Sequence, residues 1–115
     1  MMEDWQDLIT GMNGGMKNLR EGAPEMMKGF SALGQAAFGG QALDHKTKEL
    51  VALALGVAAR CAPCIAYHAQ AAAKQGATRA QALEVIGMAI YMGAGPNAMY
   101  AAQALEAFDQ LNNAK

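Results

Sequence analysis

Hydrophobic residues recur along most of this chain at the three- and four-residue spacing that is typical of α-helices. No stretch of useful length alternates hydrophobic and polar residues with the two-residue period of a strand. The pattern therefore predicts one all-α domain over residues 1–115, a bundle of about five or six helices.

The N-terminal segment predicts a short helix over residues 4–12. We expect the sequence Asn13-Gly14-Gly15 to end it, which would leave residues 1–22 as an N-terminal arm. Trp5 lies on the hydrophobic face of this helix and could cover a neighbouring active site or anchor the segment to the core. Anchoring is the favoured interpretation, because aromatic residues at helical spacing usually pack in the interior.

Pro24 predicts the start of a second helix, since proline is tolerated in a first helical turn. The helix continues through Phe38, and Gly39 and Gly40 are expected to end it. No residue of the first two helices suggests a catalytic role of its own. Their expected role is to wall the site and to supply contacts between subunits.

Two central helices are predicted to form an antiparallel pair. Asp44 is a plausible N-cap for the first, which runs to about Ala59 and is hydrophobic on nearly every side, as in a helix that is buried all round. The second starts at about Cys61, with Pro63 in its first turn and Gly76 as its C-terminal stop.

The C-terminal third predicts two further helices. Thr78 and Gln81 form a capping-box pattern for the first. The residues expected to point inward from it are Leu83, Ile86, Ala89, Ile90 and Met92. The sequence Gly93-Ala94-Gly95-Pro96 predicts a sharp turn before a final helix that ends near Leu111.

Composition narrows the classes of function. The formal net charge is -1 and no basic run is present, so the chain lacks the cations that neutralise nucleic-acid phosphates. The N-terminus does not resemble a signal peptide, and the longest strongly apolar run, residues 50–59, is shorter than the roughly 20 residues that span a bilayer. We expect a cytoplasmic protein with no membrane or nucleic-acid partner. A content of 53% hydrophobic and 17% charged residues favours surface buried between subunits over a monomer with few polar surface groups.

Four reactive side chains gather in residues 49–68: Glu49, Cys61, Cys64 and His68. A C-x-x-C at a helix start brings two sulfurs close enough to form a reversible disulfide, and the helix N-terminus favours a thiolate. His68 shares a helical face with both cysteines and can exchange a proton with a thiol. Glu49 lies in a hydrophobic lane, where a carboxylate needs a partner. His45, in an exposed first turn, is expected to be a solvated surface group.

This constellation, E-x11-C-x2-C-x3-H, resembles the active-site motif of the carboxymuconolactone decarboxylase superfamily, in its AhpD-like alkylhydroperoxidase branch. The stretch 89–108, a glycine-rich turn followed by a helix, is similar to the second signature of the family. The resemblance is good over residues 43–108 and loose over the N-terminal third. It implies an all-helical fold and assembly into homotrimers or homohexamers.

The resemblance also implies peroxide reduction at the expense of a dithiol such as lipoamide, carried on a lipoyl protein or a similar donor, with no bound cofactor. In the expected reaction, Glu49 and His68 relay a proton from a thiol, and the thiolate attacks a hydroperoxide. The resulting sulfenic acid condenses to a Cys61–Cys64 disulfide, which the dithiol reopens. Helix-start exposure favours attack by Cys61, whereas spacing couples Cys64 to His68, so the order stays open.

Three alternatives remain at this point. The decarboxylase or lactone-type branch of the superfamily shares the fold but lacks the paired cysteines, so the two thiols argue against it. A zinc-binding structural module would use the same four side chains as a tetrahedral ligand set, although three of them come from one helix. A non-catalytic module with buried cysteines would not need a matched glutamate and histidine.

Overall fold

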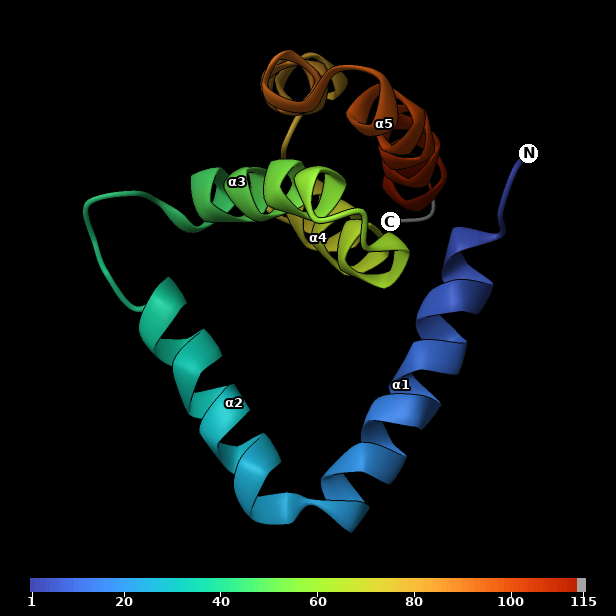
Figure 1. The fold of residues 1–115 in the computed structure, drawn as a ribbon. Helices are drawn as coiled ribbons and strands as arrows, with labels where there is room; N and C mark the ends of the chain where they lie inside the picture. The colour runs from blue at the N-terminus through green and yellow to red at the C-terminus, as the bar shows by residue number, and fades with distance from the viewer. Residues whose placement is uncertain (114–115) are drawn as a thin grey trace.

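The computed structural model describes residues 1–113, which form five helices and no strand, as the all-α prediction expects. Helices α3 (His45–Ala58), α4 (Ala62–Lys74) and α5 (Arg79–Asn113) pack against one another as a core. Helices α1 (Trp5–Gly22) and α2 (Pro24–Phe38) extend from this core and form a V whose open side faces α3 and α4 (Figure 1). The chemistry predicted from the sequence therefore lies in the core.

Alanine is the most frequent buried residue where the core helices meet. The buried alanines of α4 and of the second half of α5 are Ala66, Ala69, Ala72, Ala73, Ala101, Ala104 and Ala107. A few large side chains are fully buried among them: Trp5, Leu53, Val57, Ile65 and Phe108. Small side chains let helices approach closely, so α4 contacts both α3 and α5 over much of its length.

Helix α1 is longer than the sequence predicts, because Asn13, Gly14 and Gly15 lie inside it instead of ending it. A glycine inside a helix costs only about 1 kcal/mol, which tertiary contacts can offset. Here the Asn13 side chain accepts a hydrogen bond from the hydroxyl of Tyr67 on α4. That contact holds the middle of α1 against the core.

Trp5 anchors the start of α1, as the packing interpretation predicts. Its side chain is fully buried, and its indole nitrogen donates to Glu106 Oε2 of α5 at 2.9 Å. Its backbone N–H donates to Gln110 Oε1 at 3.1 Å. The N-terminal segment is thus fastened to the last helix of the fold.

Helix α2 begins at Pro24 and ends at Phe38, as predicted, and it packs chiefly against α1. Within residues 1–113 its one buried side chain is Met27. Met26, Phe30 and Leu33 are each at least 59% exposed. Most of the hydrophobic side chains of α2 are therefore left uncovered by the part of the chain that the structure describes.

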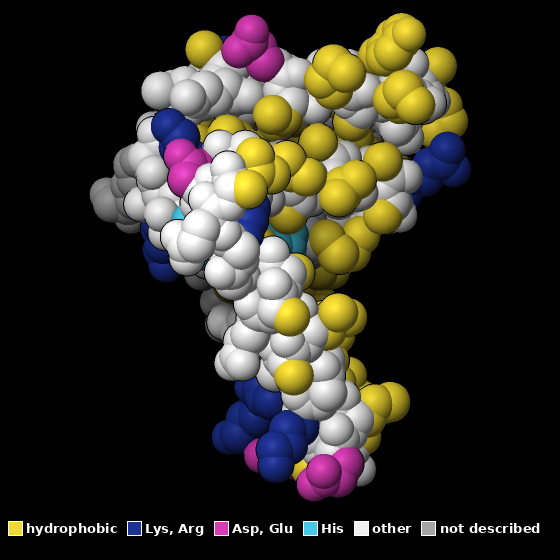
Figure 2. Space-filling view, turned by 90° about the vertical axis from the view of Figure 1, so that its left-hand side faces the viewer, with side chains coloured by type: hydrophobic (Ala, Val, Ile, Leu, Met, Phe, Trp, Pro, Cys, Tyr) yellow, Lys and Arg dark blue, Asp and Glu magenta, His cyan; other side chains and the backbone are white. Residues whose placement is uncertain are grey.

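One face of α3 is also exposed, which corrects the expectation of a helix buried all round. Leu50, Leu53 and Val57 are buried, but Val51 and Leu55 are 44% and 62% exposed. Hydrophobic side chains gather over the core on this side of the molecule and recur along one edge of the V, whereas charged side chains collect at its tip (Figure 2). None of the helices in residues 1–113 combines the length and hydrophobicity needed to cross a membrane.

Helix α5 starts with the predicted capping box, in which Thr78 and Gln81 exchange hydrogen bonds between side chain and backbone. Its first half buries fewer residues than expected. Ile86 and Ala89 are buried together with Ala82, which the pattern missed, whereas Leu83, Ile90 and Met92 are 41%, 37% and 76% exposed. The hydrophobic stripe is wider than the surface that α3 and α4 cover.

The predicted turn at residues 93–96 is a kink between two halves of α5. Ala94 leaves the helical conformation with φ 51° and ψ -132°, and Pro96 starts the second half. The buried Asn97 side chain donates to the carbonyl of Ala89 at 2.8 Å, which satisfies an acceptor near the break. A Cβ on Gly93 would lie 2.0 Å from Asn97 Nδ2, so only glycine fits beside this amide. Close packing of Gly93 against Asn97 therefore shapes this turn.

Candidate active site

The turn between α3 and α4 fixes the position of Cys61. Arg60 adopts a left-handed conformation with φ 57°, and its N–H bonds the carbonyl of Val57 at 3.0 Å. The N–H of Cys61 bonds the carbonyl of Gly56 at 3.1 Å, which completes a Schellman motif at the end of α3. Cys61 is also the N-cap of α4, so the same residue ends one helix motif and begins the next helix.

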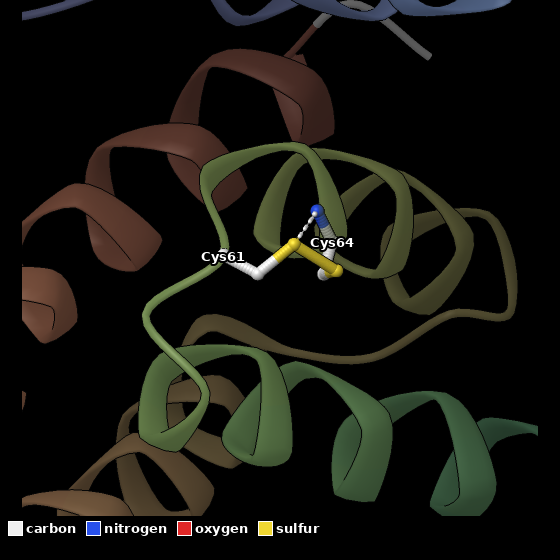
Figure 3. The surroundings of a disulfide bond; sticks show 2 residues. All are labelled: Cys61 and Cys64. Carbon is white, nitrogen blue, oxygen red and sulfur yellow. Dashed lines mark hydrogen bonds between the residues drawn. A yellow bond between two sulfur atoms is a disulfide. The ribbon is translucent and has the colours of Figure 1, made fainter. Parts of the chain in front are cut away.

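Cys61 and Cys64 form a disulfide at the N-terminus of α4 (Figure 3). Cys61 Sγ accepts a hydrogen bond from the backbone N–H of Cys64 at 3.2 Å, and the close-up shows α3 and α4 running antiparallel beside this turn. After reduction, the partial positive charge at the N-terminus of α4 would favour a thiolate at this C-x-x-C. The predicted start of the helix and the predicted antiparallel pair are both confirmed.

Glu49 and His68 are hydrogen-bonded across the α3–α4 pair. Glu49 Oε1 lies 2.8 Å from His68 Nδ1, and the side chains are 9% and 32% exposed. A carboxylate only accepts hydrogen bonds, so this contact assigns the N–H of His68 to Nδ1 and leaves Nε2 on the opposite side of the ring. The structure thus brings together the carboxylate and the imidazole that the sequence singled out.

His45 is the residue that the sequence reasoning missed. It is half-exposed, as expected of a first helical turn, but its Nε2 lies 3.1 Å from Glu49 Oε2. Asp44 caps the same turn, and hydrogen bonds from Thr47 hold the pKa of Asp44 below its ordinary value. The signal was present in the sequence, since His45 and Glu49 are four residues apart and share a helix face.

A shallow pocket of about 270 Å³ opens beside the disulfide. Cys64 and His68 line it together with side chains of α3, namely Ala52, Leu55, Gly56 and Ala59. Its wall is mostly hydrophobic, so a small organic substrate could reach Cys64 with the imidazole nearby.

Two further residues, Tyr67 and Arg60, lie next to the site in sequence. Tyr67 lies next to His68 in sequence, but its hydroxyl bonds Asn13 of α1 and therefore serves the contact between helices. Arg60 is exposed in the turn before Cys61. Over residues 1–113 no group of three or more His, Cys, Asp and Glu side chains is arranged to hold a metal ion.

Relatives of known sequence match most of the chain. An uncharacterized protein of Cupriavidus necator is 38% identical over 112 residues, which cover 97% of this chain and 99% of that protein. A protein of Paracoccus denitrificans, described as uncharacterized protein 4 in cox locus, is 38% identical over 85 residues, covering 74% and 77% of the two chains.

A solved structure has the same fold. The crystal structure of apo-lpg0406, a carboxymuconolactone decarboxylase family protein from Legionella pneumophila, matches with a TM-score of 0.90 and 48% sequence identity, covering 94% of this chain and 96% of that one. Residues 24–107 also match the sequence pattern of the carboxymuconolactone decarboxylase family as a whole. The chain therefore belongs to the carboxymuconolactone decarboxylase family.

Proposed function

We propose that this protein is a thiol–disulfide oxidoreductase that reduces organic hydroperoxides in the manner of the AhpD-like branch of its family. The observation that carries the proposal is the Cys61–Cys64 disulfide at the start of α4, with Cys64 and His68 lining one open pocket. Membership of the family supports an enzymatic role, and the paired cysteines favour redox chemistry.

The first step is a proton transfer. Glu49 holds His68 through Nδ1, so the opposite ring nitrogen is free to take the proton of the Cys64 thiol. The carboxylate then stabilises the imidazolium that forms. We assign the attack to Cys64 because it shares the pocket with His68, whereas Cys61 Sγ faces the backbone N–H at the helix start.

The redox steps then balance without a bound cofactor. The Cys64 thiolate attacks the terminal oxygen of ROOH, which breaks the O–O bond and gives a sulfenic acid and RO⁻. RO⁻ takes the proton held by His68 and leaves as ROH. The Cys61 thiol displaces the hydroxyl from the sulfenic acid, which releases water and forms the disulfide.

Reduction closes the cycle. A dithiol attacks the disulfide, passes through a mixed disulfide and leaves as its own cyclic disulfide, while both cysteines return to thiols. Lipoamide on a lipoyl protein is the donor that the family resemblance implies. A cytoplasmic location, in which thiols are kept reduced, would supply such a donor.

The proposal is tested by counting thiols and measuring the intact mass of the reduced protein, before and after one equivalent of an organic hydroperoxide. We expect both thiols to be lost with a mass decrease of about two hydrogens, and dihydrolipoamide to restore them. Protein reduced and then exposed to the corresponding alcohol is the control. Thiols that stay free after the hydroperoxide would contradict the proposal.

We also propose that the protein works as a homotrimer or homohexamer. The support is the exposed hydrophobic side chains of α2 and α3, including Phe30, Leu33 and Leu55, because exposed hydrophobic patches often mark contacts between subunits. Light scattering during size exclusion is expected to give three or six times the mass of one chain. A mass equal to one chain at micromolar concentration would rule the assembly out.

A further inference from the structure

The Glu49 carboxylate is shared between two imidazoles. Oε1 accepts from His68 at 2.8 Å and Oε2 accepts from His45 at 3.1 Å. The reaction proposed above uses only the His68 side. The second oxygen of this nearly buried carboxylate is hydrogen-bonded to another histidine, which implies a role for that histidine.

We propose that His45 is a positioning residue of the active site, which fixes the Glu49 carboxylate so that Oε1 stays aimed at His68. This inference rests on the proposed function, in which His68 is the base. His45 touches neither the thiols nor the pocket that Cys64 lines, so it acts through Glu49.

The surroundings of His45 suit this role. It is the first residue of α3, one turn before Glu49, so the two side chains lie on the same helix face. Its ring makes an edge-to-face contact with Phe38 at the end of α2, with centroids 5.3 Å apart. The ring is therefore held by an aromatic neighbour on one side and by the carboxylate on the other.

Loss of this contact has a defined consequence. Without His45, Oε2 keeps no donor within the described part of the chain, and the carboxylate can rotate about its terminal torsion. His68 would then lose the fixed partner that keeps its proton on Nδ1, so its basic Nε2 would be presented for only part of the time.

The test compares three variants in steady-state turnover of an organic hydroperoxide with dihydrolipoamide. We expect His45→Ala to lower kcat about tenfold with little change in KM, the size expected from losing one hydrogen bond to a charged group. His45→Gln should keep at least half of the wild-type kcat, because glutamine can place an amide N–H near the position of Nε2. Lys46→Ala, in the same helical turn, is the matched control and should behave as wild type.

Imidazole NMR spectra of the same proteins give a readout that does not depend on peroxidase activity. Wild type and His45→Gln should show a protected Nδ1–H on His68, and His45→Ala should lose it while remaining folded. The inference is overturned if His45→Ala keeps both its kcat and this signal, or if His45→Gln is as slow as His45→Ala with the signal intact. If wild-type protein shows the protected Nδ1–H but reduces no hydroperoxide, the proposed function fails and the positioning role of His45 stands.

Discussion

Replacing either cysteine with serine is expected to abolish peroxide turnover, with kcat at least about a thousandfold below that of the wild type. Serine is close to cysteine in size but cannot form a thiolate. In the proposed cycle, Cys64→Ser lacks the group that attacks the hydroperoxide, and Cys61→Ser lacks the thiol that resolves the sulfenic acid. The effect is measured as the rate at which the hydroperoxide is consumed in the presence of dihydrolipoamide.

The two variants should differ in one respect that identifies the attacking thiol. Cys61→Ser keeps Cys64 beside His68, so one equivalent of hydroperoxide should convert it to a sulfenic acid that a dimedone probe labels. Cys64→Ser should remain unlabelled under the same conditions. Labelling of Cys64→Ser instead would show that Cys61 attacks first, and substantial turnover by either variant would contradict the two-cysteine cycle.

Sequence reasoning located the candidate site because the elements that build it are local. The C-x-x-C, the helix start near Cys61 and the capping box at Thr78 each depend on residues within one helical turn, and all three are present in the structure. The Glu49–His68 pair required in addition that α3 and α4 run antiparallel, which a connection of three residues makes almost unavoidable.

The errors arose where tertiary contacts decide the outcome. Asn13 and its neighbouring glycines suggest a break, but the bond from Tyr67, which is distant in sequence, keeps α1 continuous. Hydrophobic periodicity showed that Leu55 and Met92 lie on apolar stripes, but it could not show which part of a stripe this chain covers. His45 is half-exposed as expected, but the sequence reasoning did not pair it with Glu49, although the two residues lie one helical turn apart.

Trp5→Ala is expected to give the largest loss of stability, lowering the free energy of unfolding by roughly 3–5 kcal/mol, the usual range for truncating a buried aromatic residue. The side chain is fully buried, and its truncation leaves a cavity between α1 and α5 as well as removing the indole donor to Glu106. Urea denaturation followed by circular dichroism measures the change. Trp5→Phe is the matched control, since it fills most of the volume and loses only the N–H, and it should retain most of the stability.

The carboxyl partner of Trp5 gives this contact a pH dependence of known sign. Hydrogen bonding from the Trp5 indole lowers the pKa of Glu106 from its ordinary value, and the backbone N–H of Met2 acts in the same direction. Because the folded-state pKa is depressed, the contribution of Glu106 is present at neutral pH and is lost as the pH falls through that pKa. Glu106→Gln keeps an acceptor without a charge, so its difference in unfolding free energy from wild type should shrink on acidification. If the difference in unfolding free energy between wild type and Glu106→Gln grew as the pH fell, the charged form of Glu106 would not stabilise its contact with Trp5. The loss of stability in Trp5→Ala would then be due to packing alone.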